Sequence, residues 1–376
     1  MSFASEEITP DFLDASHLQS EIDDFLIGFA VNRKDYISGE AKREGLAGRL
    51  TEEKRKTVWE ARESYVSYME RKKLYSINYA RLKLYNYLSE NPESPIAGRI
   101  RHIFIDEVQD INPSALLALK KLSSGHLFMA GDYSQTLYMP QQPFSRAGID
   151  IRGSVKILKT NFRNTKNIIG TAGLFRSCFE ALPEEAGEKR PDVSGSGEIT
   201  ETPSGSEETI FNASEPYSGA ALRIGPEPEL FTSDKTDDLE KLLIRRAGMF
   251  INEMGYDPSN ICILVPRNSY IEKISGLFNL EGVPLSRITD EGFDFLGTSG
   301  GSVNISTIHS SKGLDFPVIL LYLPEIVRYN RFSPETEESL AVNLIYVALT
   351  RAMDHLNVFV AESDDRIVKA LIDSFR

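Results

Sequence analysis

Two adjacent carboxylates, Asp106 and Glu107, directly follow the apolar run HIFI at residues 102–105. A carboxylate at the end of a strand can hold a magnesium ion, usually through water, while its neighbour orients or deprotonates an attacking water. This division of roles suits the hydrolysis of a phosphoanhydride. Because an isolated Asp-Glu pair after a strand is more often a solvated turn than a site, its meaning depends on what else the chain carries.

The next apolar run, HLFMA at residues 126–130, also ends in polar residues. Asp132 and Gln135 lie in the string GDYSQ, which directly follows that run. A carboxylate and an amide at this position are able to sense a terminal phosphate. The sequence therefore places a second polar group at a predicted strand end.

Two arginines are candidates for stabilising negative charge on a transferred phosphoryl group. Arg163 lies in KTNFRN, beside Phe162, whose ring is able to stack on a base, and Arg351 lies in LIYVALTRAMDHL. A binding module freed from hydrolysis has no physical need for the whole set of candidate catalytic residues. That set is Asp106, Glu107, Gln135, Arg163 and Arg351.

Short, continuous apolar runs must position these residues. They are HIFI at 102–105, HLFMA at 126–130, VKIL at 155–158, ICILV at 261–265, VNIST at 303–307, PVILLYL at 317–323 and LNVFV at 356–360. Such runs, separated by helical stretches such as PSALLALKKL, are typical of parallel strands buried on both faces. The pattern predicts an α/β fold with its chemistry just after the strands, at their carboxyl ends.

Residues 1–95 are predicted to be helical, because apolar residues recur there at spacings of three and four. This region also mixes basic residues with tyrosines: Arg71, Lys72, Lys73, Arg81 and Lys83 with Tyr68, Tyr75, Tyr79, Tyr85 and Tyr87. Such a mixture suits attraction to a nucleic-acid backbone combined with base stacking. An ordinary amphipathic helix, with tyrosines packed inward and basic residues solvated, explains it as well.

Composition limits the class of protein. The net charge of −13 argues against a protein that coats nucleic acid through bulk charge, so any DNA contact must be a local groove. Two cysteines and five scattered histidines indicate neither a disulfide framework nor a zinc site. With no leader-like N-terminus and no apolar run near the roughly 20 residues that cross a bilayer, we expect a cytoplasmic protein without membrane contact.

Five strings, in order, resemble motifs II to VI of the UvrD/Rep/PcrA-like superfamily 1 DNA helicases: DEVQD, GDYSQ, NFRN, TIHSSKGLDF and YVALTRA. The resemblance implies two RecA-like parallel-sheet domains with an N-terminal helical insertion-type domain. It also implies ATP and magnesium as cofactors, and 3′ to 5′ movement along single-stranded or partial duplex DNA as the nucleotide cleft between the domains closes and opens. The expected divisions are a helical region 1–95, the rest of the first domain 96–183, a linker 184–224 and the second domain 225–376.

The resemblance also assigns roles to residues that bind the nucleotide. Asp106 would serve magnesium, Glu107 would activate water, and Gln135, Arg163 and Arg351 would contact the γ-phosphate. Phe162 would stack on adenine. In the string KGLDF, Gly313 and Asp315 would lie near the nucleotide, with Asp315 standing where the family usually has a glutamate close to the sugar.

Contacts with DNA are implied for three residues. Thr307 and His309 would touch the backbone of the single strand. A Trp-Arg pair that stacks on DNA in the family is replaced here by MPQQPF at residues 139–144, in which Phe144 is a candidate substitute.

One family motif is missing from the sequence. The glycine-rich loop GxxxxGK[ST], whose amides and lysine cradle phosphates, does not occur, and neither does its preceding strand. The first domain is therefore expected to be incomplete, with a phosphate loop supplied by an upstream segment or a second chain. The alternative is a catalytically inactive helicase-like module that binds single-stranded DNA or a protein partner, whereas a serine hydrolase or metal nuclease lacks the necessary residues.

Overall fold

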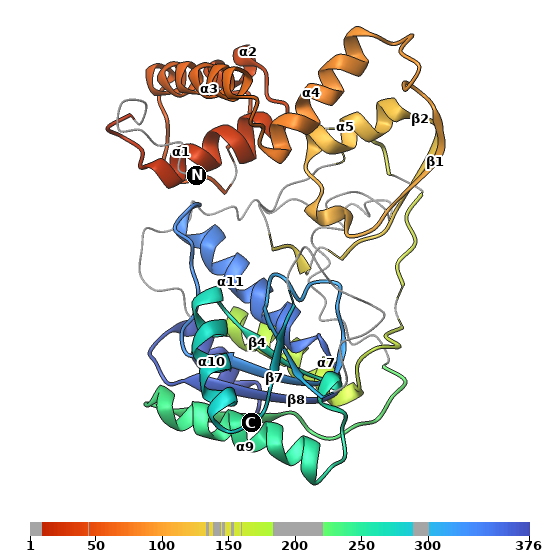
Figure 1. The fold of residues 1–376 in the computed structure, drawn as a ribbon. Helices are drawn as coiled ribbons and strands as arrows, with labels where there is room; N and C mark the ends of the chain where they lie inside the picture. The colour runs from red at the N-terminus through yellow and green to blue at the C-terminus, as the bar shows by residue number, and fades with distance from the viewer. Residues whose placement is uncertain are drawn as a thin grey trace, which may run out of the picture. The chain divides into compact units, whose positions relative to one another are not determined.

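The computed structural model describes residues 10–43, 45–132, 135–137, 144, 147–151, 154–158, 160–182, 221–288 and 301–376 (Figure 1). The chain forms two compact units. Unit 1 contains the described residues up to Val155 together with Arg328–Leu340, and unit 2 contains those from Lys156 to Val327 together with Ala341–Arg376. The predicted domain limits stay predictions, and most of the expected linker at 184–224 lies outside the described residues.

The N-terminal part of unit 1 is helical, as the sequence predicts. Its helices are α1 (Ala15–Gln19), the π-helix η1 (Ser20–Ile27), α2 (Arg33–Ser38), α3 (Glu52–Lys72) and α4 (Ile77–Glu90). Side chains of Asn32, Thr51 and Ser76 accept hydrogen bonds from backbone N–H groups in the first turns of α2, α3 and α4, which fixes where these helices begin. Phe25, Tyr36 and Trp59 are central to the core that the helices share.

Acidic side chains of the π-helix η1 tie this helical part together. Glu21, which is fully buried, accepts hydrogen bonds from Tyr36 at 2.7 Å and from the Arg43 guanidinium through both of its oxygens. Asp23 accepts a hydrogen bond from Ser76, the residue that caps α4. A buried charge is tolerated only when it is paired and hydrogen-bonded, so these contacts fix how the helices pack.

A two-stranded parallel sheet follows the helices. It consists of β1 (Ile100–Ile105) and β2 (Ser123–Met129), linked by the 3₁₀ helix η2 (Val108–Asp110) and by α5 (Pro113–Leu122). One face packs on the apolar side of α5 around Leu116, whereas Phe104 and Phe128 stack on the other face with ring centroids 4.8 Å apart. Both predicted strands are confirmed.

The strand predicted at residues 155–158 is wrong. These residues form no helix or strand, and Val155, Ile157 and Leu158 are exposed. The run is apolar enough for a buried strand, but a strand also needs a neighbour with which to pair. In the described part of unit 1, only β1 and β2 pair in a sheet.

Unit 2 is built on a six-stranded sheet with the order β3-β8-β7-β4-β6-β5, in which every neighbouring pair is parallel. The strands are β3 (Glu229–Ser233), β4 (Ile261–Val265), β5 (Leu285–Arg287), β6 (Val303–Thr307), β7 (Phe316–Leu323) and β8 (Ala352–Ala361). The four apolar runs predicted as strands in this region are all present. The α/β class and the parallel sheets are therefore confirmed, and the architecture is consistent with RecA-like domains.

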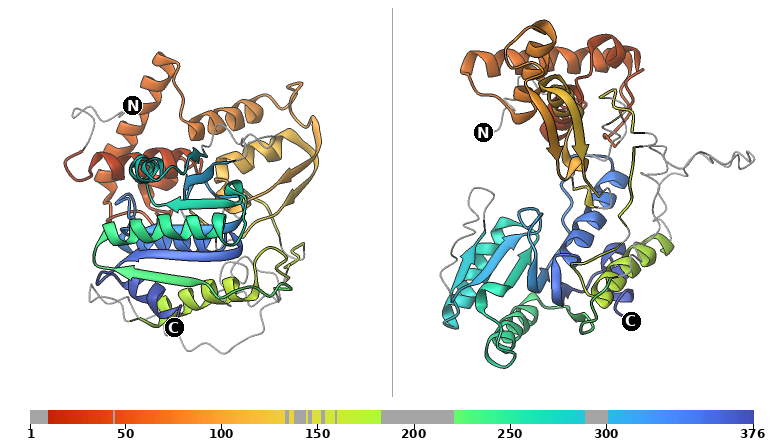
Figure 2. Two further views of the ribbon diagram at one scale, coloured as in Figure 1. Left: turned by 60° about the horizontal axis from the view of Figure 1, so that its bottom comes forward. Right: turned by 90° about the vertical axis from the view of Figure 1, so that its right-hand side faces the viewer.

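Helices pack on the sheet of unit 2 (Figure 2). They are α7 (Lys166–Ala181), α9 (Thr236–Asn252), the 3₁₀ helix η4 (Pro258–Asn260), α10 (Asn268–Leu280), α11 (Pro334–Leu349), whose C-terminal part from residue 341 belongs to this unit, and α12 (Arg366–Asp373). Apolar residues of α9 and α10, such as Leu243 and Phe278, share a core with Ile263 and Leu320 of the central strands. Burial of this sheet explains why its central strands have almost no polar side chains.

Because of Asp24, we expect unit 1 to lose stability as the pH rises. Burial raises the pKa of the Asp24 carboxyl to about 6, although Arg331, at 2.9 Å, opposes the rise. A carboxyl whose pKa is raised on folding stabilises the folded state most below its unfolded pKa, and this contribution disappears as the pH rises through the folded pKa. Asp24→Asn should therefore remove up to about 3 kcal/mol of the decline in unfolding free energy between acidic and neutral pH.

The measurement is urea unfolding at several pH values, followed by fluorescence of Trp59, the only tryptophan in the chain and a core residue of unit 1. Asp11→Asn, which removes an exposed carboxyl of the same unit, is the control. If both variants keep the pH dependence of the unsubstituted chain, Asp24 is not its source.

Candidate functional site

The end of β1 places Asp106 and Glu107 in a tight turn. Glu107 has left-handed backbone angles, φ 50° and ψ 43°, and its N–H donates a hydrogen bond of 2.9 Å to Asp106 Oδ1. Left-handed backbone at a residue other than glycine is uncommon and tends to occur at functional sites. The turn sets the two carboxylates on different paths although they are adjacent in sequence.

A buried glutamine joins this turn to the end of β2. Gln109 is 6% exposed; its Nε2 donates to Glu107 Oε2, and its Oε1 accepts a hydrogen bond of 3.1 Å from the Asp132 N–H. Asp132 in turn accepts a hydrogen bond of 2.9 Å from Gln135 Nε2. The structure therefore brings together Glu107, Asp132 and Gln135, the polar groups that the sequence places at two separate strand ends.

The carboxylates of this turn fit a magnesium ion that binds together with a nucleotide. Oxygen ligands are those that Mg²⁺ prefers, and at phosphate sites it takes one or two carboxylates and completes its coordination with phosphate and water. Among the residues that the structure describes, no group of three or more metal-ligating side chains forms a metal cage. Asp106, which is exposed, suits a magnesium ion of the kind that relies on phosphate and water for its other ligands.

In unit 2, the two candidate arginines converge on one carboxylate. Arg163 Nε lies 2.8 Å from Asp315 Oδ2, and Arg351 Nη1 lies 3.6 Å from Asp315 Oδ1. The Arg163 side chain is 42% exposed, whereas that of Arg351 is 1% exposed and donates to the backbone carbonyls of Val347 and Leu314. Burial raises the pKa of the Asp315 carboxyl, and the two guanidinium groups oppose that rise.

This cluster does not lie where the sequence led us to expect chemistry. Asp315 and Arg351 directly precede β7 and β8, whose first residues, Phe316 and Ala352, pair in parallel register. The cluster is thus at the amino ends of two strands instead of their carboxyl ends. Its position comes from the turns that lead into the strands.

Asn164 holds the two arginine-bearing segments together, a role that the sequence analysis missed. It is 2% exposed, and its Nδ2 donates hydrogen bonds to the carbonyls of Thr350 at 2.8 Å and Ala352 at 2.7 Å. Those carbonyls stand on either side of Arg351. The only sequence signal is the asparagine that directly follows Arg163 in NFRN.

Other predicted nucleotide and DNA contacts have mixed surroundings. Phe162 is 71% exposed, and Gly313 has a φ of +80° in the turn before β7. Thr307 ends β6, and its Oγ1 accepts a hydrogen bond of 3.1 Å from the Ser310 N–H, while His309 in the same turn is partly exposed. The ligand contacts of these residues remain predictions.

The proposed stacking of Phe144 on DNA is corrected by the structure. Phe144 is 4% exposed and packs in the core of unit 1 with Ile105 and Leu116. A ring that already fills a core cannot also offer a face to a base. The string MPQQPF therefore supplies an apolar anchor in place of a stacking residue.

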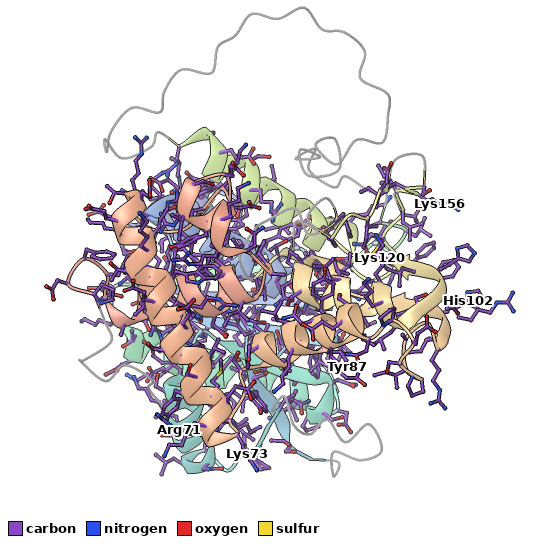
Figure 3. All side chains as sticks on the ribbon, turned by 90° about the horizontal axis from the view of Figure 1, so that it is seen from above. Arg71, Lys73, Tyr87, His102, Lys120 and Lys156 are labelled. Carbon is purple, nitrogen blue, oxygen red and sulfur yellow. The ribbon has the colours of Figure 1, made fainter. Side chains whose placement is uncertain are left out.

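The mixture of basic residues and tyrosines on α3 and α4 is partly paired within itself. Glu70 accepts hydrogen bonds from Tyr75, Tyr79 and Lys83 at 3.1, 2.9 and 2.7 Å respectively. Lys73, by contrast, is exposed at the end of α3 (Figure 3). A role of this surface in binding DNA remains a prediction.

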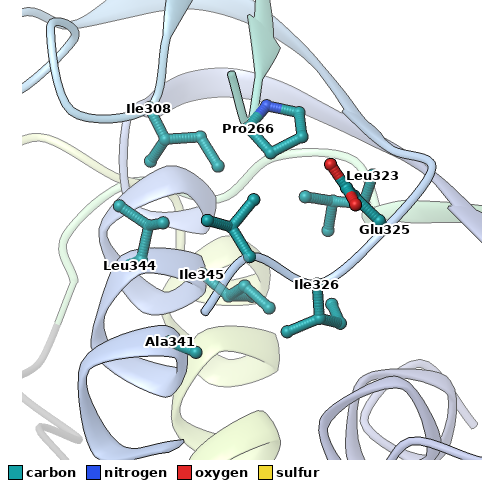
Figure 4. Close-up of a pocket in the computed structure, with 9 residues that line it drawn as sticks. Pro266, Ile308, Leu323, Glu325, Ile326, Ala341, Leu344 and Ile345 are labelled. Atoms are coloured by element: carbon teal, nitrogen blue, oxygen red, sulfur yellow. The ribbon is translucent and has the colours of Figure 1, made fainter. Parts of the chain in front are cut away.

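A small apolar pocket lies beside the carboxyl ends of β4, β6 and β7 (Figure 4). Ile308, Leu323 and Leu344 are among the residues that line it, and Glu325 is the one charged residue among the described residues of its lining. Apolar walls and a carboxylate cannot pair the charges of a polyphosphate. The arginine cluster is the better candidate for that ligand in unit 2.

The fold and these residues together define a class of protein. Parallel α/β sheets with carboxylates and an amide at one set of strand ends, and paired arginines at another, provide the groups that phosphoryl-transfer proteins use. A model of the UvrD/REP helicase N-terminal domain matches residues 11–142, and a model of the UvrD-like helicase C-terminal domain matches residues 295–363. The chain belongs to the UvrD/Rep-like helicase family.

Relatives of the chain are named as helicases. It is 27% identical over 304 residues to an ATP-dependent helicase/nuclease of Lactococcus lactis subsp. lactis (strain IL1403), covering 73% of this chain and 24% of that protein. It is 23% identical over 295 residues to the putative ATP-dependent DNA helicase R568 of Acanthamoeba polyphaga mimivirus, covering 73% of this chain and 37% of that protein. The matches thus span well under half of either relative.

Among solved structures, the C-terminal domain of a possible DNA helicase from Lactobacillus plantarum WCFS1 is similar to 41% of this chain and 85% of its own, with 18% identity and a TM-score of 0.32. That score is too low to establish a shared fold. Within the described residues, we find no helix with the length and apolar character needed to span a membrane.

We expect Gly131→Ala to disturb the Gln109 link. A Cβ at Gly131 would overlap Gln109 Oε1 and lie 2.8 Å from Val108 Cγ1, so the glutamine must move. Forcing extra atoms into a packed site should lower the unfolding free energy by about 1–3 kcal/mol.

Thermal unfolding of the variant measures this loss. Gly170→Ala is the matched control, because a Cβ there meets nothing within 4 Å and the residue lies inside α7. The control should be neutral or stabilising by up to about 1 kcal/mol. Equal stability of the two variants would show that Gln109 has room to adjust.

Proposed function

We propose that this chain forms the motor part of a UvrD-like ATP-dependent DNA helicase. One observation carries the proposal: Arg163 and Arg351, from distant parts of the sequence, meet at the single carboxylate of Asp315. Paired arginines are the groups that stabilise charge on a transferred phosphoryl group. The names of the relatives, both ATP-dependent helicases, support the same activity.

Unit 1 would supply the groups that activate water. In the proposed reaction, Glu107 orients a water molecule toward the γ-phosphorus and accepts its proton, while the β,γ-bridging oxygen leaves with ADP. Asp106 would hold magnesium, which, when bound, neutralises charge on the phosphates. Gln135 would contact the terminal phosphate, and its bond to Asp132 links that contact to the Gln109 bridge.

Unit 2 would supply positive charge and contacts with the rest of the nucleotide. Arg163, the more exposed of the two arginines, is better placed to reach a ligand, whereas Arg351 must leave its carbonyl partners to do so. Phe162, with its ring exposed, would stack on adenine. Gly313 and Asp315 would lie near the sugar.

DNA would be the track along which the motor moves. We assign the backbone contacts to Thr307 and His309, at the end of β6 and in the turn after it, and propose 3′ to 5′ movement on single-stranded or partial duplex DNA. The resemblance of TIHSSKGLDF to a family motif supports both assignments.

The proposed hydrolysis also needs a phosphate-binding loop. The 376 residues contain no GxxxxGK[ST] string, so we propose that another segment or a second chain provides this loop. The same observation favours a second candidate function, a helicase-like module that binds single-stranded DNA or a protein partner without turnover.

DNA-stimulated ATP hydrolysis by this chain discriminates between the two functions. We expect any turnover to rise on addition of single-stranded DNA and to fall at least about 100-fold in Glu107→Gln, because the variant lacks the base that accepts the proton of water. Glu90→Gln, which changes an exposed glutamate of the same unit, should retain full turnover.

Neither ATP turnover nor nucleotide binding by the unsubstituted chain would reject a self-sufficient motor and favour the binding module. Turnover that survives in Glu107→Gln would show that another group, or another protein in the sample, performs the hydrolysis.

A further inference from the structure

We infer that Asp315 is a built-in counter-anion, which occupies the anion-binding arginines until the phosphates of a ligand displace it. The inference deepens the proposed function and rests on it for the identity of the natural ligand. The anion site itself is argued from the side chains of unit 2 alone.

The charges of the three side chains are unequal. Two guanidinium groups face one carboxylate, and Arg351 also donates to neutral backbone carbonyls. Guanidinium groups remain charged at every pH at which proteins fold. The three side chains together are therefore positively charged even when Asp315 is ionised, and displacement of Asp315 would present both guanidinium charges to an incoming anion.

The contact of Asp315 with the arginines is suited to displacement. Arg163 approaches Oδ2 through Nε, while Asp315 Oδ1 is buried and accepts no hydrogen bond within the described residues. The strongest arginine–carboxylate contact is a fork in which two N–H groups reach two oxygens, and this contact is not of that kind. A polyphosphate, with several charged oxygens, offers Arg163 better acceptors than Asp315 does.

The segments that carry the arginines stay in place without Asp315. Asn164 joins the Arg163 segment to the carbonyls of Thr350 and Ala352, and Arg223 Nη1 donates a hydrogen bond of 2.9 Å to the Arg163 carbonyl. Because the backbone is held by these bonds, Asp315 acts on where the guanidinium groups point and on their net charge.

The test is the affinity of the chain for inorganic pyrophosphate, measured by calorimetry for the unsubstituted chain and for Asp315→Asn. A counter-anion competes with the ligand, so its removal should tighten pyrophosphate binding by about tenfold. Asp315→Glu keeps the charge and should bind as the unsubstituted chain does. Adding Arg163→Ala to Asp315→Asn should abolish the gain.

Glu325→Gln is the matched control, because Glu325 forms an arginine–carboxylate pair with Arg267 in the same unit at 3.1 Å. Its affinity for pyrophosphate should not change. A gain in affinity distinguishes the two roles, since loss of a merely structural contact would weaken binding. Unchanged or weaker binding to Asp315→Asn would overturn the inference.

A second measurement uses the unsubstituted chain and so does not depend on folding of the variant. The ¹H–¹⁵N signal of Arg163 Nε, assigned with Arg163→Lys, should shift when pyrophosphate displaces Asp315. A signal that stays in place at saturating pyrophosphate overturns the inference. Pyrophosphate has no nucleoside and needs no hydrolysis, so these results remain decisive if the chain proves to have no ATP turnover.

Discussion

The arrangement of the arginine cluster depends on one buried side-chain amide. Asn164 Nδ2 donates to two backbone carbonyls, those of Thr350 and Ala352, from a position 186 and 188 residues earlier in the chain. A buried polar group that loses its partners costs about 1–3 kcal/mol, so the fold strongly favours the conformation in which both bonds form. Arg163 precedes the donor and Arg351 lies between the acceptors, which brings both guanidinium groups to Asp315.

Unit 1 uses the same physical device. Gln109 is a buried amide that donates to Glu107 and accepts from the backbone of Asp132, so it fixes the ends of β1 and β2 relative to each other. An amide is well suited to this task because it offers both a donor and an acceptor and adds no charge. Each unit thus holds charged groups in position through a neutral side chain that has no role in chemistry.

The sequence predicted the parts of the fold that local pattern determines. Runs such as ICILV are continuous and apolar because both faces of β4 are buried, whereas β5, with the residues LSR, is too short and polar to give a signal. VKIL failed because pairing is not local, and Phe144 failed because its burial depends on packing with β1 and α5. Asp106, Glu107 and Arg163 were found through their motifs. The linking roles of Gln109 and Asn164 require contacts between distant segments, which a single sequence does not reveal.

The central claim is that the glutamine of unit 1 and the arginine of unit 2 serve one nucleotide. A double-mutant cycle with Gln135→Ala and Arg163→Ala, measured on the affinity for a non-hydrolysable ATP analogue with magnesium, tests it most directly. Groups that act on the same phosphate should show a coupling free energy of at least about 1 kcal/mol. Effects that add within about 0.5 kcal/mol, or an unsubstituted chain that does not bind the analogue, would contradict the claim.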